Sequence, residues 1–279
     1  MTFEAVSYES IPHALISGIA ISLLCSVVGL FLVLRKFSLF GDALAHSAFG
    51  GVAFGLFIGI YPLWIACAVA ILSALGLSKI RQKFDISGDA IVAILLSTGL
   101  GAGVILVSLT EDFEFHDIEE FLFGSAIVDT QNVVAILAMA GIILTILFFT
   151  YKKILYSTFS EEQAKASGIP VEKMSYLLIA MAGVTVVISM QLVGVLLISA
   201  LFVLPNVSAM LYARSFKQTV ILSMSFAVFA TVSGIIMSYQ FEIAQAGCIV
   251  LVAAAIFIGS LVAKGSGLVK TAGILAKHA

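Results

Sequence analysis

Asp42 and His46 stand four residues apart in the apolar segment SLFGDALAHSAFGGVAFG, the most informative stretch of the sequence. On a helix this spacing places two side chains on one face, on adjacent turns. A carboxylate and an imidazole arranged in this way form part of a ligand set for a divalent metal ion. Ser38, at the start of the segment, is the predicted N-cap of the helix.

The same pair also has a structural explanation. Asp42 would lie in the first turn of its helix and interact favourably with the helix dipole, while His46 would donate one hydrogen bond to a neighbouring carbonyl. An aspartate near the centre of a membrane span costs roughly 2.5 to 3.5 kcal/mol, so such groups usually face a cavity or a bundle interior. Spacing alone leaves both explanations open.

The composition indicates a helical membrane protein. Of the 279 residues 61% are hydrophobic and 11% are charged, whereas a soluble domain usually has ~25% charged residues. The apolar residues form runs of about 18 to 22, long enough to cross a ~30 Å hydrocarbon layer as helices. A net charge of −2 offers no basic surface for nucleic acid. We expect an all-α transmembrane bundle in the lipid bilayer, with residues 1–279 as one domain and no nucleic acid bound.

Polar breaks divide the chain into about nine candidate spans, or eight to ten if the region 176–213 is divided differently. The spans cover residues 14–34, 39–58, 62–80, 90–110, 131–150, 176–191, 193–213, 218–239 and 245–263. Within 176–213 the segment MQLVGV must turn in a few residues, and a re-entrant hairpin is an alternative there.

The basic residues predict the orientation. With the N-terminus outside, all 14 Lys and Arg residues fall on the cytoplasmic side, as the positive-inside rule requires. The connection 151–175 and the C-terminus are then cytoplasmic. The acidic loop 111–130 is then outside, where three roles are open: it gathers cations, it docks a binding protein, or it is simply a solvated loop. Its candidate contact residues are His116, Asp117, Glu119 and Glu120.

The connection 151–175 carries the pattern of a short helix. Ser160 and Gln163 form a capping box, and Gly168 and Pro170 supply a stop. The resulting helix at 161–167 is too short to be stable alone in water. It either packs on neighbouring spans or acts as a coupling helix in a groove of another subunit. The chain lacks a GxxxxGK[ST] phosphate loop, so we expect no enzyme activity and assign any ATP-driven motion to a separate polypeptide.

Three stretches together resemble one family. RKFSLFGDALAHS, LFG at 122–124 and EEQAKASG at 161–168 are similar to the permeases of bacterial ABC importers for zinc, manganese or iron. The resemblance follows the order of elements over essentially the whole chain, and GDALAH is its most specific part. One departure is Asn206, where the resemblance leads us to expect a small apolar residue.

The resemblance implies a fold like that of the vitamin B12 and siderophore importer permeases, in the bacterial cytoplasmic (inner) membrane. It implies a homodimer that works with ATP-binding ABC subunits and receives metal from an extracytoplasmic binding protein. It also implies that Asp42 and His46 line the metal pathway, and that the ATPase contact includes Glu161, Glu162, Ala164 and Gly168.

The transported ion is less well defined than the site. Two copies of the chain would offer two carboxylates and two imidazoles, which suit Zn²⁺ but are also accepted by Mn²⁺ and Fe²⁺. We expect zinc, with manganese or iron as alternatives, and no tightly bound cofactor. The main competing function is an ATP-independent secondary transporter or channel for a divalent cation. It would need carboxylates deep in several spans, whereas Asp42 is nearly the only acidic residue away from a membrane surface. An intramembrane hydrolase is disfavoured because no GxSxG or HExxH motif occurs in a span.

Overall fold

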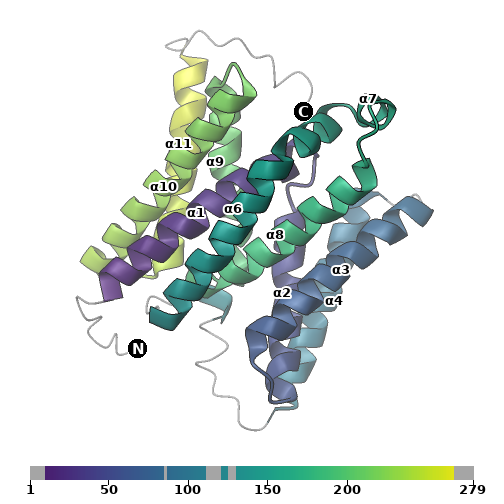
Figure 1. The fold of residues 1–279 in the computed structure, drawn as a ribbon. Helices are drawn as coiled ribbons and strands as arrows, with labels where there is room; N and C mark the ends of the chain where they lie inside the picture. Colours follow the sequence, from purple (N-terminus) through teal and green to yellow (C-terminus); the bar gives the residue numbers. More distant parts are fainter. Residues whose placement is uncertain (1–9, 85–86, 111–120, 125–129, 267–279) are drawn as a thin grey trace.

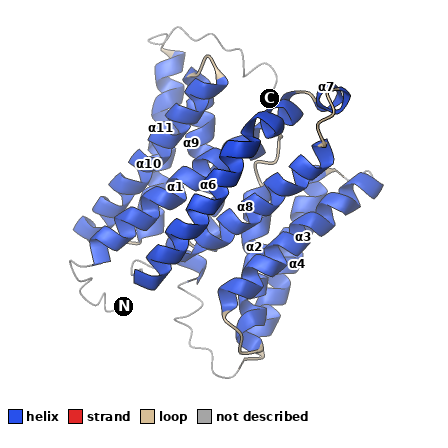
Figure 2. Ribbon diagram, viewed as in Figure 1, coloured by secondary structure: helices blue, strands red, loops and turns tan. Residues whose placement is uncertain are grey.

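The chain folds into a bundle of helices. The structure is a computed structural model that describes residues 10–84, 87–110, 121–124 and 130–266, and the elements in these ranges are helical (Figures 1 and 2). The helices are α1 (Ser10–Leu34), α2 (Phe40–Phe57), α3 (Pro62–Phe84), α4 (Gly88–Ser108), α6 (Thr130–Phe159), α7 (Glu161–Ala166), α8 (Val171–Val193), α9 (Ile198–Tyr212), α10 (Phe216–Phe241) and α11 (Gln245–Gly265), with a short 3-10 turn, η1 (Val195–Leu197).

The helices form three groups. α2, α3 and α4 pack together on one side, α9, α10 and α11 on the other, and α1, α6 and α8 lie between them (Figure 1). α1 and α8 carry most of the contacts that join the groups, because α1 packs on α6, α8, α9 and α10, and α8 packs on α3 and α2.

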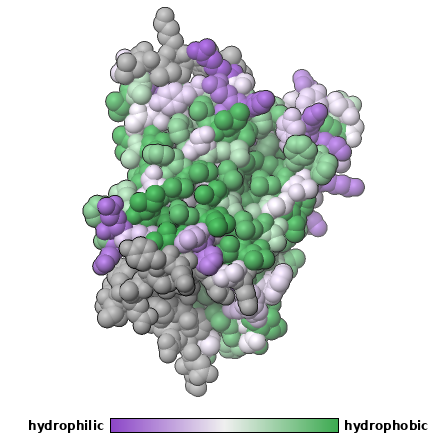
Figure 3. All heavy atoms as spheres, turned by 60° about the vertical axis from the view of Figure 1, so that its left-hand side comes forward, coloured by the Kyte–Doolittle hydropathy of each residue, from purple (hydrophilic) through white to green (hydrophobic). Residues whose placement is uncertain are grey.

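The helices have the length and composition of membrane spans. In the described part of the chain, α1, α4, α6, α8, α10 and α11 are long and apolar enough to cross a bilayer, and α3 and α9 contain shorter apolar stretches. Figure 3 shows hydrophobic side chains in a broad band across the molecule, with hydrophilic ones gathered at its upper end. The prediction of a helical membrane protein is confirmed, while the count of nine crossings stays a prediction.

The region 176–213 contains two helices, as predicted. α8 ends at Val193, and Gly194 follows with a φ of 74°. Because this left-handed conformation strains residues with a Cβ, glycine suits the break. The segment 121–124 packs against it, since a Cβ on Gly194 would collide with the carbonyl oxygen of Leu122.

Two local predictions are wrong. Ser38 is not the N-cap of α2, because Leu39 holds that position and no side chain caps the helix. The connection around the short helix is shorter than the predicted 151–175, because α6 continues to Phe159 and α8 begins at Val171. A 30-residue helix is about 45 Å long, so α6 is longer than the hydrocarbon layer is thick, and the polar end of the helix was mistaken for a loop.

Asn206 is accommodated by hydrogen bonds inside the bundle. Its side chain is fully buried, its Nδ2 donates to the carbonyl oxygen of Phe202 at 2.6 Å, and its Oδ1 accepts from the Ser223 hydroxyl. Ser223 is also 2.8 Å from the hydroxyl of Ser26. These bonds join α9, α10 and α1 and satisfy an amide that would otherwise be costly to bury.

Candidate metal site and coupling helix

Asp42 and His46 lie in the first two turns of α2, the most enclosed helix of its group. Of its 18 residues 14 are buried, so other helices cover most of its surface. A Cβ on Gly99 of α4 would be 2.7 Å from the carbonyl carbon and oxygen of His46. The two helix backbones therefore touch at the residue that carries the imidazole.

The two side chains are placed to share one ion. Nε2 of His46 is 4.0 Å from Oδ1 of Asp42, and the side chains are 9% and 25% exposed, respectively. This distance is too long for a hydrogen bond. Two donors that bind one ion at about 2.0–2.2 Å each are separated by at most about 4.4 Å, so this pair can reach a common ion.

The imidazole of His46 has no hydrogen-bond partner among the described residues. Its Nδ1 is buried and unpaired, and Nε2 has only the long contact to Asp42. Buried polar atoms in folded proteins are nearly always hydrogen-bonded. The structural explanation thus holds for Asp42, which lies in the first turn of α2, but not for His46, whose expected bond to a carbonyl is absent from the described residues.

The described residues of one chain supply only part of a ligand set. In the described ranges, no three His, Cys, Asp or Glu side chains lie close enough together to hold a metal ion. A zinc site usually has four ligands, of which a catalytic site takes three from protein. Asp42 and His46 therefore need water or donors from outside the described part of this chain.

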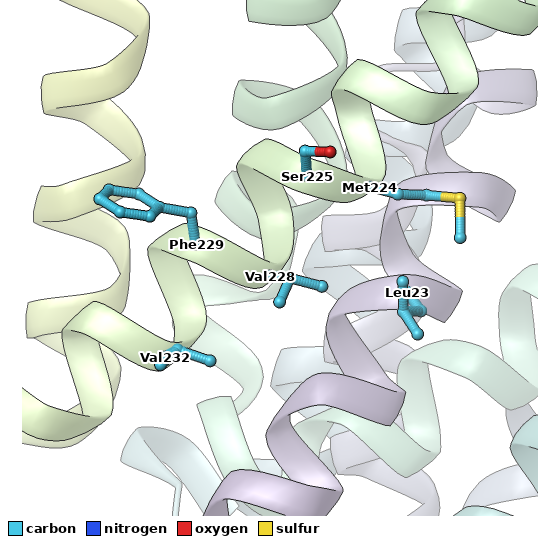
Figure 4. A pocket seen from close by; sticks show the side chains of 6 residues that line it. All are labelled: Leu23, Met224, Ser225, Val228, Phe229 and Val232. Carbon is cyan, nitrogen blue, oxygen red and sulfur yellow. The ribbon is translucent and has the colours of Figure 1, made fainter.

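The groove between α1 and α10 is apolar. It has a volume of about 460 Å³ and is lined by Leu23, Met224, Ser225, Val228, Phe229 and Val232 (Figure 4). Its lining offers no carboxylate, imidazole or thiol group. This groove is not a metal site.

The short helix α7 forms where the capping pattern predicts it. The Ser160 hydroxyl accepts a hydrogen bond from the Gln163 backbone N–H at 3.4 Å, and Gly168 has a φ of 77°. The helix ends at Ala166, one residue earlier than expected. Capping and a left-handed glycine are local signals, which explains why the sequence predicts this element so closely.

The four predicted coupling residues do not share one environment. Glu161, Glu162 and Gly168 are exposed, but Ala164 is fully buried. α7 packs on α6 and α8, so Ala164 anchors the helix and does not present a surface to another subunit. His116, Asp117, Glu119 and Glu120 lie outside the described residues, and their role stays a prediction.

Arg35 is a site residue whose partners the sequence did not predict. From the sequence, Arg35 is expected only to orient the chain as a basic residue and to form part of the family pattern. In the structure its guanidinium binds three hydroxyl groups on α6 and α8, on either side of α7. The sequence contains two signals for these contacts: a cation directly after a span, and a hydroxyl pair just before the capping box. The two signals are 122 residues or more apart.

These features are those of a polytopic membrane protein, with a buried carboxylate–imidazole pair inside the bundle and an exposed short helix at one end. The chain belongs to the ABC 3 transport family, whose model matches residues 7–264. As a permease subunit of such a transporter it is not itself the ATPase, and ATP hydrolysis belongs to a separate subunit.

Relatives transport more than one metal. The chain is 29% identical to the high-affinity zinc uptake system membrane protein ZnuB of Haemophilus influenzae, over 91% of this chain and 97% of that protein. It is 32% identical to the manganese import system permease protein ScaB of Streptococcus gordonii, over 91% of each chain. The structure of PsaBC from Streptococcus pneumoniae in complex with Fab is also similar, with a TM-score of 0.83 and 32% identity over 91% of this chain and 92% of that one.

Proposed function

We propose that the chain forms the translocation pathway of an ATP-driven importer for a divalent transition metal ion, with Asp42 and His46 binding the ion in transit. The observation that carries the proposal is the buried Nδ1 of His46, which has no hydrogen-bond partner among the described residues, in a ring that lies beside the Asp42 carboxylate. Ionisable groups within a membrane bundle usually mark an ion pathway. Family membership favours this function over the ATP-independent transporter or channel.

The ion is zinc or manganese, and we favour zinc. The matched relatives include both a zinc and a manganese system, and a carboxylate with an imidazole accepts either ion, as well as iron. A transit site must release its ion, so few protein ligands and an exchangeable water suit it better than a closed structural shell.

A second copy of the chain completes the proposed site. Each chain offers two donors, so two copies around a shared axis would bring two carboxylates and two imidazoles. Four nitrogen and oxygen donors match the coordination number of zinc. The homodimer is therefore part of the proposal, and it accounts for the small number of ligands among the described residues of one chain.

The remaining parts of the proposal concern orientation and partners. Nine helices cross the bacterial cytoplasmic membrane with the N-terminus outside and the C-terminus inside, because the basic residues then lie in the cytoplasm. α7 contacts an ATP-binding ABC subunit, and an extracytoplasmic metal-binding protein delivers the ion. The exposed carboxylates of Glu161 and Glu162 support such a contact. The arrangement of helices seen in vitamin B12 and siderophore importers also stays a prediction.

Uptake by the complete transporter in proteoliposomes tests this function. We expect accumulation of radioactive zinc or manganese that requires ATP, and its loss in Asp42→Asn, which keeps the side-chain size but removes the charge. Ser47→Ala is the control on α2, because Ser47 is buried directly after His46 and its hydroxyl bonds Ser73 at 2.8 Å. Metal uptake without ATP, or wild-type uptake by Asp42→Asn, would refute the proposal.

A further inference from the structure

Arg35 occupies the turn between α1 and α2. The turn is a Schellman motif, in which the N–H of Phe37 donates to the carbonyl of Leu32 at 2.9 Å and the N–H of Lys36 donates to that of Val33 at 3.0 Å. Lys36 has the left-handed φ of 62° that this motif requires. The turn thereby fixes the position of Arg35 at the end of α1 and of the chain that enters α2.

The Arg35 side chain holds two other helices. Its Nε donates to the Thr158 hydroxyl at 3.0 Å, one terminal nitrogen donates to Ser157 at 2.8 Å, and the other donates to Ser175 at 2.7 Å. Ser157 and Thr158 each donate their own proton to the carbonyl of Ile154. Their remaining lone pairs are therefore free to accept from the guanidinium, whose planar donors suit several acceptors at once.

The three acceptors flank the proposed coupling helix in the sequence. Ser157 and Thr158 are in the last turn of α6, directly before α7, and Ser175 is in the second turn of α8, directly after it. Figure 1 shows α7 in the connection between the end of α6 and the start of α8. A displacement of α7 must therefore move at least one of the groups that Arg35 binds.

Arg35 also interacts with α7 through charge. Burial lowers the pKa of the Arg35 guanidinium, and the carboxylate of Glu161, the first residue of α7, raises it. An opposite charge nearby compensates part of the cost of removing a cation from water. Glu161 is thus both an exposed residue of α7 and an electrostatic partner of Arg35.

We infer that Arg35 is a positioning residue that transmits the movement of α7 to α2. The inference rests on the proposed function, in which α7 contacts the ATPase and α2 binds the metal. Arg35 is seven residues before Asp42, and the Schellman turn and the first turn of α2 are the whole connection between them. A shift of the guanidinium is therefore passed to the helix that carries Asp42 and His46.

The test is the amount of metal transported for each ATP hydrolysed in proteoliposomes that contain the permease, its ATPase and its binding protein. Arg35→Lys keeps the charge but cannot make the same three bonds. We expect the ratio of metal to ATP to fall about tenfold or more, because two or three hydrogen bonds are lost, while assembly with the ATPase and basal ATP hydrolysis change less than about twofold. Lys36→Asn is the matched control, because it removes the neighbouring exposed charge and asparagine tolerates a positive φ.

A second variant covers the possibility that Arg35→Lys does not fold. Ser175→Ala removes one acceptor on α8 and should lower the same ratio by a smaller factor. An unchanged ratio in both variants, or a fall in uptake that only follows the amount of assembled transporter, would overturn the inference. The proposed function is tested by a different variant, Asp42→Asn, in which the contacts of Arg35 remain intact. Wild-type uptake by Asp42→Asn would refute the proposed function.

Discussion

The Nε2 atom of His46 lies 4.0 Å from Oδ1 of Asp42, and the two side chains extend from adjacent turns of α2. Their separation is fixed by the helix itself, since residues four apart share a face. The position of the pair in the bundle depends on the neighbouring helices. At His46 the backbone of α2 lies directly against Gly99 of α4, with no side chain between them.

Gly99→Ala should displace the imidazole. The new Cβ would lie 2.7 Å from the carbonyl group of His46, so the helices must separate. We expect a loss of about 1–3 kcal/mol in unfolding free energy, as for other overpacked sites, and reduced metal uptake per inserted molecule. Melting of the purified protein in detergent and normalised uptake measure the two effects.

Gly101→Ala is the control for this substitution. Gly101 is on the same helix, but a Cβ there has no neighbour within 4 Å. Alanine in a helix is favoured over glycine by about 0.5–1 kcal/mol, so this variant should be at least as stable as the wild type. Equal behaviour of the two variants would show that the α2–α4 contact does not position His46.

Gly168→Val should uncouple ATP hydrolysis from transport. Gly168 has a φ of 77°, and a β-branched residue there is strained by about 1–2 kcal/mol. The end of α7 should shift and weaken its contact with the ATPase, while membrane insertion persists. Co-purification of the ATPase and its stimulation by the binding protein measure the effect. Gly168→Asn, which tolerates the left-handed conformation, should retain both, and normal coupling in Gly168→Val would remove α7 from the ATPase contact.

The predicted orientation is tested by cysteine labelling in intact cells. Cys25 and Cys248 are buried and Cys67 is partly buried, and all three are first replaced by serine or alanine. In that background a membrane-impermeant maleimide should label His116→Cys in intact cells and Lys165→Cys only after permeabilisation. The opposite labelling pattern would show that the topology is inverted, because the sides predicted for both positions follow from the same distribution of basic residues.

Much of the helix pattern is predictable from the sequence. Apolar runs separated by polar breaks placed every long helix of the described residues, including the break at Gly194. The capped helix α7 was also predicted, because Ser160, Gln163 and Gly168 act within a few residues of one another. These elements depend on local hydrophobicity and backbone conformation.

Contacts between distant residues were not predictable. Arg35 and Ser175 are 140 residues apart in the sequence, and one sequence contains no signal for such a pair. The turn before α2 was misread for a related reason. Ser38 has the right residue type for an N-cap, but the Schellman motif at Lys36 and Phe37 decides how the chain enters the helix.

The ratio of zinc to manganese uptake in Asp42→Cys decides whether Asp42 binds the transported ion. A thiolate in place of the carboxylate is a softer ligand, which Zn²⁺ accepts and Mn²⁺ disfavours. If Asp42 is a ligand, the ratio should rise about tenfold or more over that of the wild type, a change of about 1.4 kcal/mol or more in relative binding. If uptake of both ions falls by the same factor, or neither changes, Asp42 does not bind the ion in transit.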